Sequence, residues 1–351
     1  MKPWSITAAG PTACDERGLP QVTSKSLLKA VFSREETERP PVIPYVCSFA
    51  ARLRGVSTRN MLNDPTTLAN SLQDAVRLFD YDGITSVFDP TLEAEACGCE
   101  VTWPEDGPPH IASHPLGEGL PVEGLDAPEF ENRGRIAVVM EATRRIKVVL
   151  GDEKMVIGVL SGPITLLQAL SGKNLSEFGE EGTAELEGIL RAVETVATRM
   201  VQLYGEIQVD AVMVVEESLS PRDAHDLDRV LPVYHSLWNI AGFYGAGSIL
   251  LCGESTHELE RSLQDIAADC VVLGRGSSLS RSRNIALENN LCFGGGIPTR
   301  DLFGPPEEVK KVVRESMEEG GRRGFLLCTD WEVPYDAPVE GLHAVMEAAR
   351  K

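Results

Sequence analysis

Short continuous runs of apolar residues recur along the chain and alternate with longer segments of helical character. Continuous runs are typical of strands that are buried on both faces, whereas half-exposed strands alternate. The expected strands are residues 42–47, 83–89, 155–160, 211–216, 248–252, 270–273, 291–294 and 325–328. The expected helices are residues 24–33, 66–79, 133–149, 184–204, 224–241, 257–266, 306–319 and 338–350. The pattern predicts an α/β fold.

Eight short strands, each followed by a helix or by a loop and a helix, are the number needed for a closed (β/α)8 TIM barrel. A doubly wound open sheet is the alternative, but no glycine-rich phosphate turn follows the first strand. We expect residues 1–40 to form an N-terminal arm and helix, and residues 41–351 to form a single barrel domain. Residues 90–130 are rich in Gly, Pro and acidic residues and predict a lid-like insertion after the second strand.

Composition and charge narrow the classes of function. The chain has 351 residues, of which 42% are hydrophobic, and a formal net charge of −20. This charge argues against binding to nucleic acid or to anionic lipid, and favours small molecules or proteins with basic patches as partners. No apolar run approaches the roughly 20 residues that span a bilayer, and the first residues do not show the basic region followed by an apolar one that is typical of a signal peptide. We therefore expect a cytoplasmic protein whose eight cysteines are reduced thiols.

Three predicted strands end in residues that bind metals. Cys252 and Cys328 are the last apolar residues before polar loops, and the strand before Cys252 ends in Glu216 and Glu217. If these strands open onto one barrel mouth, the side chains form a thiolate and carboxylate set suited to zinc. Alternation along a strand directs only one of the two glutamates to the barrel axis. Packing is the alternative for each cysteine, and Cys292 is a further candidate ligand.

Several motifs occur in an order that is known from one protein superfamily. They are Arg39-Pro-Pro-Val42, Phe88-Asp89, Gly162-Pro-Ile-Thr165, Leu219-Ser-Pro221, Cys252-Gly253, Gly295-Gly-Ile-Pro298 and Cys328. From about residue 25 to residue 350 the chain resembles the uroporphyrinogen decarboxylase superfamily of eight-stranded β/α barrels. The resemblance implies one of two activities: cofactor-free decarboxylation of a porphyrinogen, or zinc-dependent methyl transfer to or from a corrinoid protein.

The chain is more similar to the methyltransferase branch, which includes methylcobalamin:coenzyme M methyltransferases and the methyltransferase I component of O-demethylases. The arginine-rich motif of the decarboxylases is not found after Pro44, where Arg52 and Arg54 are the only basic residues nearby. The cysteine spacing matches members that methylate thiols. Leu250 replaces their histidine, however, so we expect Glu216 or Glu217 to supply the missing ligand.

The resemblance implies Zn²⁺ as a cofactor and a corrinoid (cobalamin) supplied by a partner protein. We expect methyl transfer from an O-methylated small molecule, an aryl methyl ether, to the Co(I) corrinoid. Asp89 is then either a proton donor to the departing oxygen or a structural carboxylate, and Trp331 with Tyr335 either flanks an aromatic donor or packs at the rim. The alternative activities are methylation of a thiol by methylcobalamin and decarboxylation of the uroporphyrinogen type. A homo-oligomer is compatible with each of them.

Overall fold

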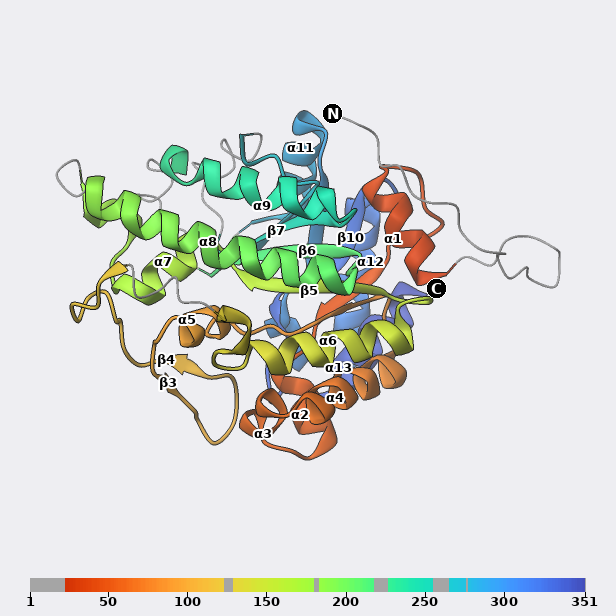
Figure 1. The fold of residues 1–351 in the computed structure, drawn as a ribbon. Helices are drawn as coiled ribbons and strands as arrows, with labels where there is room; N and C mark the ends of the chain where they lie inside the picture. Colours follow the sequence, from red (N-terminus) through yellow and green to blue (C-terminus); the bar gives the residue numbers. More distant parts are fainter. Residues whose placement is uncertain are drawn as a thin grey trace.

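The computed structural model describes residues 23–122, 129–179, 183–217, 227–254, 265–275 and 277–350. Its centre is a parallel sheet in the order β1-β10-β9-β8-β7-β6-β5-β2 (Figure 1). The strands are β1 (Val42–Tyr45), β2 (Gly83–Thr85), β5 (Met155–Ser161), β6 (Ala211–Glu216), β7 (Gly247–Glu254), β8 (Cys270–Arg275), β9 (Cys292–Ile297) and β10 (Phe325–Glu332). The two outer strands of this order lie side by side, because the Asp82 amide before β2 donates to the Val42 carbonyl of β1 at 2.8 Å. The predicted barrel is confirmed.

Helices cover the outside of the barrel. They are α1 (Ser24–Phe32), α2 (Ser48–Arg54), α3 (Thr58–Asn63), α4 (Pro65–Phe79), α5 (Leu92–Ala96), α6 (Ile136–Leu150), α7 (Pro163–Ser171), α8 (Thr183–Ile207), α9 (Leu231–Phe243), α11 (Leu279–Asn289), α12 (Pro306–Gly320) and α13 (Val339–Ala349). Within the described ranges, no helix has both the length and the apolar character needed to cross a membrane.

Most predicted helices match an observed helix to within a few residues, but α2, α3, α5, α7 and α11 were not predicted. In α11 only Ser282 and Ala286 are buried, so its sequence lacks the apolar stripe that reveals a helix. The predicted helix 257–266, apart from its last two residues, lies outside the described residues, and so do residues 1–22 of the predicted arm. The helix 224–241 begins later than expected within the described part, at Leu231.

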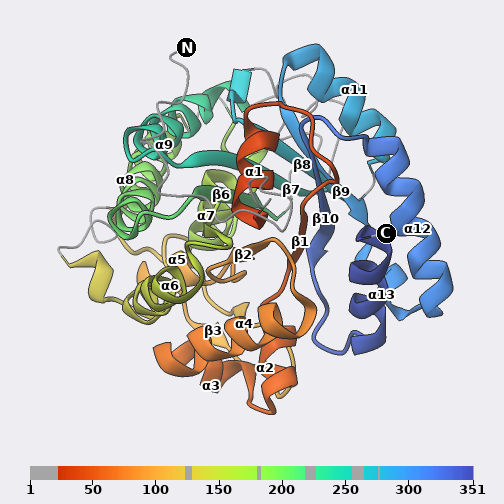
Figure 2. The same cartoon turned by 90° about the vertical axis from the view of Figure 1, so that its right-hand side faces the viewer.

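Helix α1 crosses the N-terminal end of the barrel, and Figure 2 views the molecule from this end. Leu28 and Val31 of α1 are fully buried. The Cys292 thiol at the start of β9 donates to the Val31 carbonyl at 3.0 Å. This end of the barrel is therefore closed, and access to the interior is from the C-terminal ends of the strands.

The insertion after β2 contains α5 and a small antiparallel hairpin of β3 (Val101–Thr102) and β4 (His110–Ile111). Trp103 follows the first hairpin strand and lies between two guanidinium groups. The centroid of one of its rings is 4.9 Å from Cζ of Arg135 and 5.9 Å from Cζ of Arg59. Such cation–π contacts hold the hairpin against the barrel.

Candidate functional site

Glu216, at the C-terminal end of β6, points out of the barrel into the helix layer. Its buried carboxylate accepts hydrogen bonds from the Thr165 amide (2.8 Å), the Thr165 hydroxyl (2.7 Å) and the Ile164 amide (3.2 Å), all at the start of α7. The Tyr234 hydroxyl of α9 donates a further bond. Burial raises the pKa of Glu216, and the bonds from Tyr234 and Thr165 act in the opposite direction. The carboxylate caps α7, because it binds amides that the helix leaves unpaired.

Cys252 of β7 shares this outer face. It is the register partner of Glu216 in the β6–β7 ladder, and paired residues of a parallel ladder point to the same side. The thiol is fully buried. Burial raises its pKa well above the usual value, and the nearby Glu216 carboxylate raises it further. The thiol form is therefore favoured at neutral pH, and the thiolate that binds metals is disfavoured.

Cys328 of β10 points the other way, into the barrel. A Cβ built on Gly294 would lie 2.9 Å from both the Cys328 sulfur and a methyl of Val272, so these groups share one face. Val272 pairs with Leu251, the residue before Cys252. Because successive side chains of a strand alternate, Cys252 lies on the opposite face from Cys328.

The surroundings of Cys328 differ accordingly. The Tyr45 hydroxyl donates a hydrogen bond to the Cys328 sulfur, which opposes the effect of burial, and the pKa of this thiol is raised to about 12. The expectation that the strands end at the two cysteines is wrong, because β10 continues to Glu332 and β7 to Glu254. Polar residues continue both ladders beyond the last apolar residue.

The fit of these residues to zinc can be tested on the geometry. Among the residues in the described ranges, no three His, Cys, Asp or Glu side chains are grouped as metal ligands. Glu217 is exposed at the mouth near Arg275 and His110, while Cys292 lies at the closed end. The described donors do not form a three-ligand set, and zinc stays a prediction. The Leu219-Ser-Pro221 motif lies outside the described residues.

Asp89 follows β2 at the barrel rim and is buried in an ion pair. Its Oδ2 contacts the Arg135 guanidinium, and its Oδ1 accepts hydrogen bonds from the Thr91 amide (2.9 Å) and hydroxyl (2.7 Å). Arg135 also pairs with Glu95 at 2.7 Å. Both oxygens of Asp89 are thus occupied, which fits a structural carboxylate better than a proton donor.

Two other carboxyl groups near Asp89 were not identified from the sequence. Glu332, the last residue of β10, accepts bonds on Oε1 from the Ser48 amide (2.6 Å) and hydroxyl (2.7 Å). Glu93 of α5 is fully buried and accepts a bond on Oε2 from the Ser161 hydroxyl at 2.8 Å, while its Oε1 is buried without a partner. Burial raises the pKa of each carboxyl to about 7. Only the strand-end position of Glu332 could have indicated a role.

Aromatic side chains line the interior next to these acids. The ring of Tyr45 stacks on Phe88 at 5.6 Å between centroids, and Phe88 meets the edge of Trp331 at 5.0 Å. The Arg275 guanidinium lies 5.7 Å from the Trp331 ring. Tyr335 lies apart from this group, beside Asp106 of the insertion. The structure thus places Trp331 at the rim with Phe88, and it does not bring Tyr335 to the same wall.

A model of the uroporphyrinogen decarboxylase (URO-D) family matches residues 23–351. The chain belongs to the URO-D family. Among its relatives is a methylated-thiol–coenzyme M methyltransferase of Methanosarcina mazei, 24% identical over 75% of this chain and 71% of the relative. Another is the methylcobamide:CoM methyltransferase MtbA of Methanosarcina acetivorans, 21% identical over 86% of this chain and 90% of the relative.

A uroporphyrinogen decarboxylase of Flavobacterium johnsoniae is also similar, with 22% identity over 82% of this chain and 85% of the relative. The solved structure of a methyltransferase from Methanosarcina mazei aligns with a TM-score of 0.83 and 19% identity, over 94% of this chain and 99% of the other. This structural likeness supports the barrel fold of the URO-D chain.

The arginines after β1 of this URO-D chain are occupied by structural contacts. Arg52 donates to the Ala337 carbonyl and lies over the Phe49 ring, while Arg54 pairs with Asp74 on the outside of the barrel. Arg52 and Arg54 therefore do not form the cluster of guanidinium groups that a substrate with several carboxylates would need.

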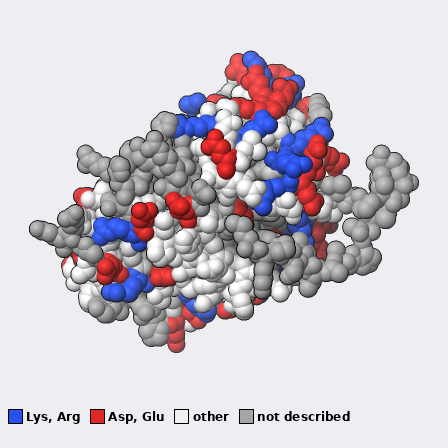
Figure 3. All heavy atoms as spheres, turned by 90° about the horizontal axis from the view of Figure 1, so that it is seen from above, with Lys and Arg blue, Asp and Glu red and all other residues white. Residues whose placement is uncertain are grey.

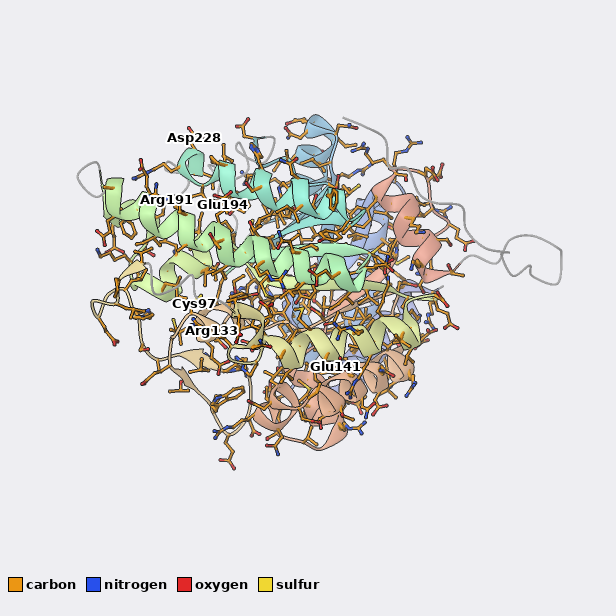
Figure 4. The ribbon with its side chains drawn as sticks, in the orientation of Figure 1. Cys97, Arg133, Glu141, Arg191, Glu194 and Asp228 are labelled. Atoms are coloured by element: carbon orange, nitrogen blue, oxygen red, sulfur yellow. The ribbon has the colours of Figure 1, made fainter. Side chains whose placement is uncertain are left out.

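Cys97 and Cys99, which are two residues apart, are packed inside the protein. Cys97 ends α5 near Arg133, as Figure 4 shows, and the Cys99 thiol donates to the Ala169 carbonyl at 3.4 Å. Both thiols are buried.

Proposed function

We propose that this protein is a methyltransferase that moves a methyl group from an O-methylated, aromatic small molecule to the Co(I) corrinoid of a partner protein. The observations that carry the proposal are the contact of Phe88 with Trp331 and the position of a carboxyl group, Glu332, at the end of the same strand, at the open end of the barrel. An aromatic wall suits a planar ring, and an acid at the same rim suits a leaving oxygen that needs a proton.

One feature of the chain supports methyl transfer over decarboxylation. The arginines near β1 bind other parts of the protein, since Arg52 donates to the Ala337 carbonyl and Arg54 pairs with Asp74. Removal of several carboxylates from one substrate would require positive charge at the mouth. Among the described residues there, Arg135 is paired with Asp89, and Arg275 lies near Glu217 and the Trp331 ring, so these arginines already have partners within the chain.

Methylation of a thiol by a methylated corrinoid is the second candidate. It is favoured by the coenzyme M methyltransferases among the relatives. The two candidates differ in the atom next to the methyl group, which is oxygen in an ether and sulfur in a thiol. An acid at the rim is useful to a departing phenolate, whereas a thiol acceptor has to lose a proton.

Zinc, which the resemblance implies, would act as a Lewis acid at the leaving or attacking atom. Cys252 and Cys328 lie on opposite faces of the sheet, so the described residues do not form the site as predicted. We therefore assign no step of the reaction to a metal.

The corrinoid partner has to approach the open end, because α1 fills the other. On the face in Figure 3, acidic and basic side chains are interspersed around a broad uncharged area. A partner that docks at the mouth is therefore selected by the local charges of the rim, such as Glu217 and Arg275, more than by the total charge.

The experiment that tests the proposal is a methyl-transfer assay with two sets of reactants. The protein is mixed with a reduced corrinoid protein and methoxybenzene donors, or with a methylated corrinoid and 2-mercaptoethanesulfonate. We expect the ether reaction, seen as the change in corrinoid absorbance together with release of phenol. Turnover only in the thiol direction would favour the second candidate, and release of CO₂ from a porphyrinogen would contradict both.

Trp331 provides a variant for the same assay. Trp331→Leu removes the exposed part of the aromatic wall, and we expect the KM for the ether to rise by about tenfold. Phe243→Leu is the matched control, because Phe243 is 83% exposed at the end of α9 that lies near the closed end of the barrel. An unchanged KM in the Trp331 variant would contradict ring binding at this wall.

A further inference from the structure

Glu332 lies at the junction of three neighbouring strand ends. It ends β10, pairs in register with Tyr45 of β1, and is close enough to Asp89 after β2 to feel its charge. Trp331, the residue before it, forms the exposed part of the aromatic wall. In barrels of this kind, groups at the C-terminal ends of strands are the ones that reach bound substrates.

The two oxygens of Glu332 have different surroundings. Oε1 is held by the Ser48 amide and hydroxyl, which fixes the orientation of the carboxyl group. No described residue donates a hydrogen bond to Oε2. One oxygen is thus anchored while the other is free to carry and release a proton.

The other rim acids lack this combination. Asp89 is occupied on both oxygens by Arg135 and Thr91. Glu93 of α5 is fully buried, so its carboxyl group is not exposed to a molecule in the mouth. Burial raises the pKa of Glu217, and the nearby Arg275 and His110 act in the opposite direction, but no described side chain anchors its carboxyl group as Ser48 anchors that of Glu332.

We propose that Glu332 is the acid that protonates the leaving oxygen of the methyl donor. This inference rests on the proposed ether demethylation. In the step, an electron pair of the attacking Co(I) forms the new bond to the methyl carbon, and the carbon–oxygen bond breaks with its electron pair left on oxygen. The Glu332 proton moves to that oxygen, so that a phenol leaves and a carboxylate stays behind.

The electrostatic surroundings of Glu332 suit this role. Burial is the main cause that raises its pKa to about 7, and the Asp89 carboxylate adds to the effect. The hydrogen bonds from Ser48 favour the ionised form and act in the opposite direction. Cys47 also lies nearby, with a pKa raised by burial, and Arg135 reduces the effect of Asp89 by pairing with it. An acid with a pKa near the working pH is the most effective proton donor.

The test compares donors that differ only in the leaving group. A methoxybenzene releases a basic phenolate that needs a proton, whereas a nitro-substituted methoxybenzene releases a weakly basic one. For Glu332→Gln we expect a loss of kcat of about 100-fold with the first donor, in the range typical of general-acid catalysis, and of less than about tenfold with the second. Glu340→Gln, an exposed residue of α13, is the matched control and should retain wild-type rates with both.

A second readout does not depend on methyl transfer. Difference infrared spectra of wild type minus Glu332→Gln should contain the carbonyl band of a protonated carboxyl group at pH 6, and this band should disappear by pH 8. The rate with the unsubstituted ether should fall over the same pH interval, because the protonated form is the active one. Absence of the band at pH 6 would overturn the proposal.

The outcomes separate the two levels of inference. If wild type demethylates neither ether, the proposed function fails, and the acid role of Glu332 fails with it. If wild type is active and the kcat of Glu332→Gln falls by the same factor with both donors, Glu332 has only a structural role. If the variant keeps its full rate with the unsubstituted ether, another group supplies the proton, and the assignment to Glu332 is wrong.

Discussion

Glu216 at the end of β6 and Glu332 at the end of β10 belong to the same sheet, and they illustrate two uses of a carboxyl group at a strand end. Glu216 on the outer face is bound by Thr165, Ile164 and Tyr234, and its role is to join β6 to α7 and α9. Glu332 at the rim is held on one oxygen only, by Ser48. A strand-end position alone therefore does not indicate a catalytic carboxyl group. The number of donors that already occupy its oxygens separates a structural group from a reactive one.

The largest expected effect concerns the outer glutamate. Glu216→Ala leaves two amides of α7 and the Tyr234 hydroxyl without an acceptor and opens a cavity. We expect the free energy of unfolding to fall by about 3 to 5 kcal/mol, measured by urea denaturation. Glu217→Ala, one residue further on and exposed, should change it by less than about 0.5 kcal/mol. Similar losses in both variants would remove the contrast between the outer face and the rim.

Glu93 is an intermediate case, because it is buried like Glu216 but has one unpaired oxygen. Burial raises its pKa from the usual value of 4.5 to about 7 in the folded chain, so the folded state binds this proton more tightly than the unfolded state. Its contribution to stability is thus complete below pH 4.5 and is lost as the pH rises to about 7. We expect a loss on the order of 3 kcal/mol across this interval.

Glu93→Gln tests this expectation, because an amide of the same shape cannot titrate. Urea denaturation at pH 5 and pH 8 should show a smaller decrease in the free energy of unfolding for the variant than for wild type. An identical decrease in both proteins would mean that Glu93 is ionised throughout this range.

The smallest expected effect concerns the two cysteines. If Cys252 packs on the outer face, Cys252→Ser should lower the free energy of unfolding by about 1 kcal/mol and leave the zinc content of the protein unchanged. Elemental analysis of the Ser variants at Cys252 and Cys328, with Cys292→Ser as a control, measures the second point. Joint loss of zinc in the first two variants alone would contradict their placement on opposite faces.

The barrel was predictable because its signal is local. Each buried strand is a run of apolar residues, such as Val212 to Val215, and the order of strands and helices follows directly along the chain. The faces of the strands were not predictable to the same degree. The polar residues Thr329 and Asp330 hide the continuation of β10, so Cys328 was assigned to a strand end although it lies inside the strand.

The candidate site depends on contacts between distant segments, and these leave little trace in the sequence. The residues next to Glu216 in the sequence do not predict its hydrogen bond with Tyr234, because Tyr234 comes from the following helix. Arg135 was not singled out for the same reason, although it neutralises Asp89 and contacts Trp103. Trp331 contacts Phe88, which lies far earlier in the chain, and the sequence does not reveal this contact.

The helix across the N-terminal end of the barrel also constrains the kinetics. With Leu28 and Val31 filling that end, small molecules and a large partner share a single entrance. A partner that covers the entrance blocks exchange of the small molecule, so the donor has to bind first and its product leaves last. The reaction order is then compulsory, and steady-state rates with the two substrates varied should follow an ordered sequential pattern.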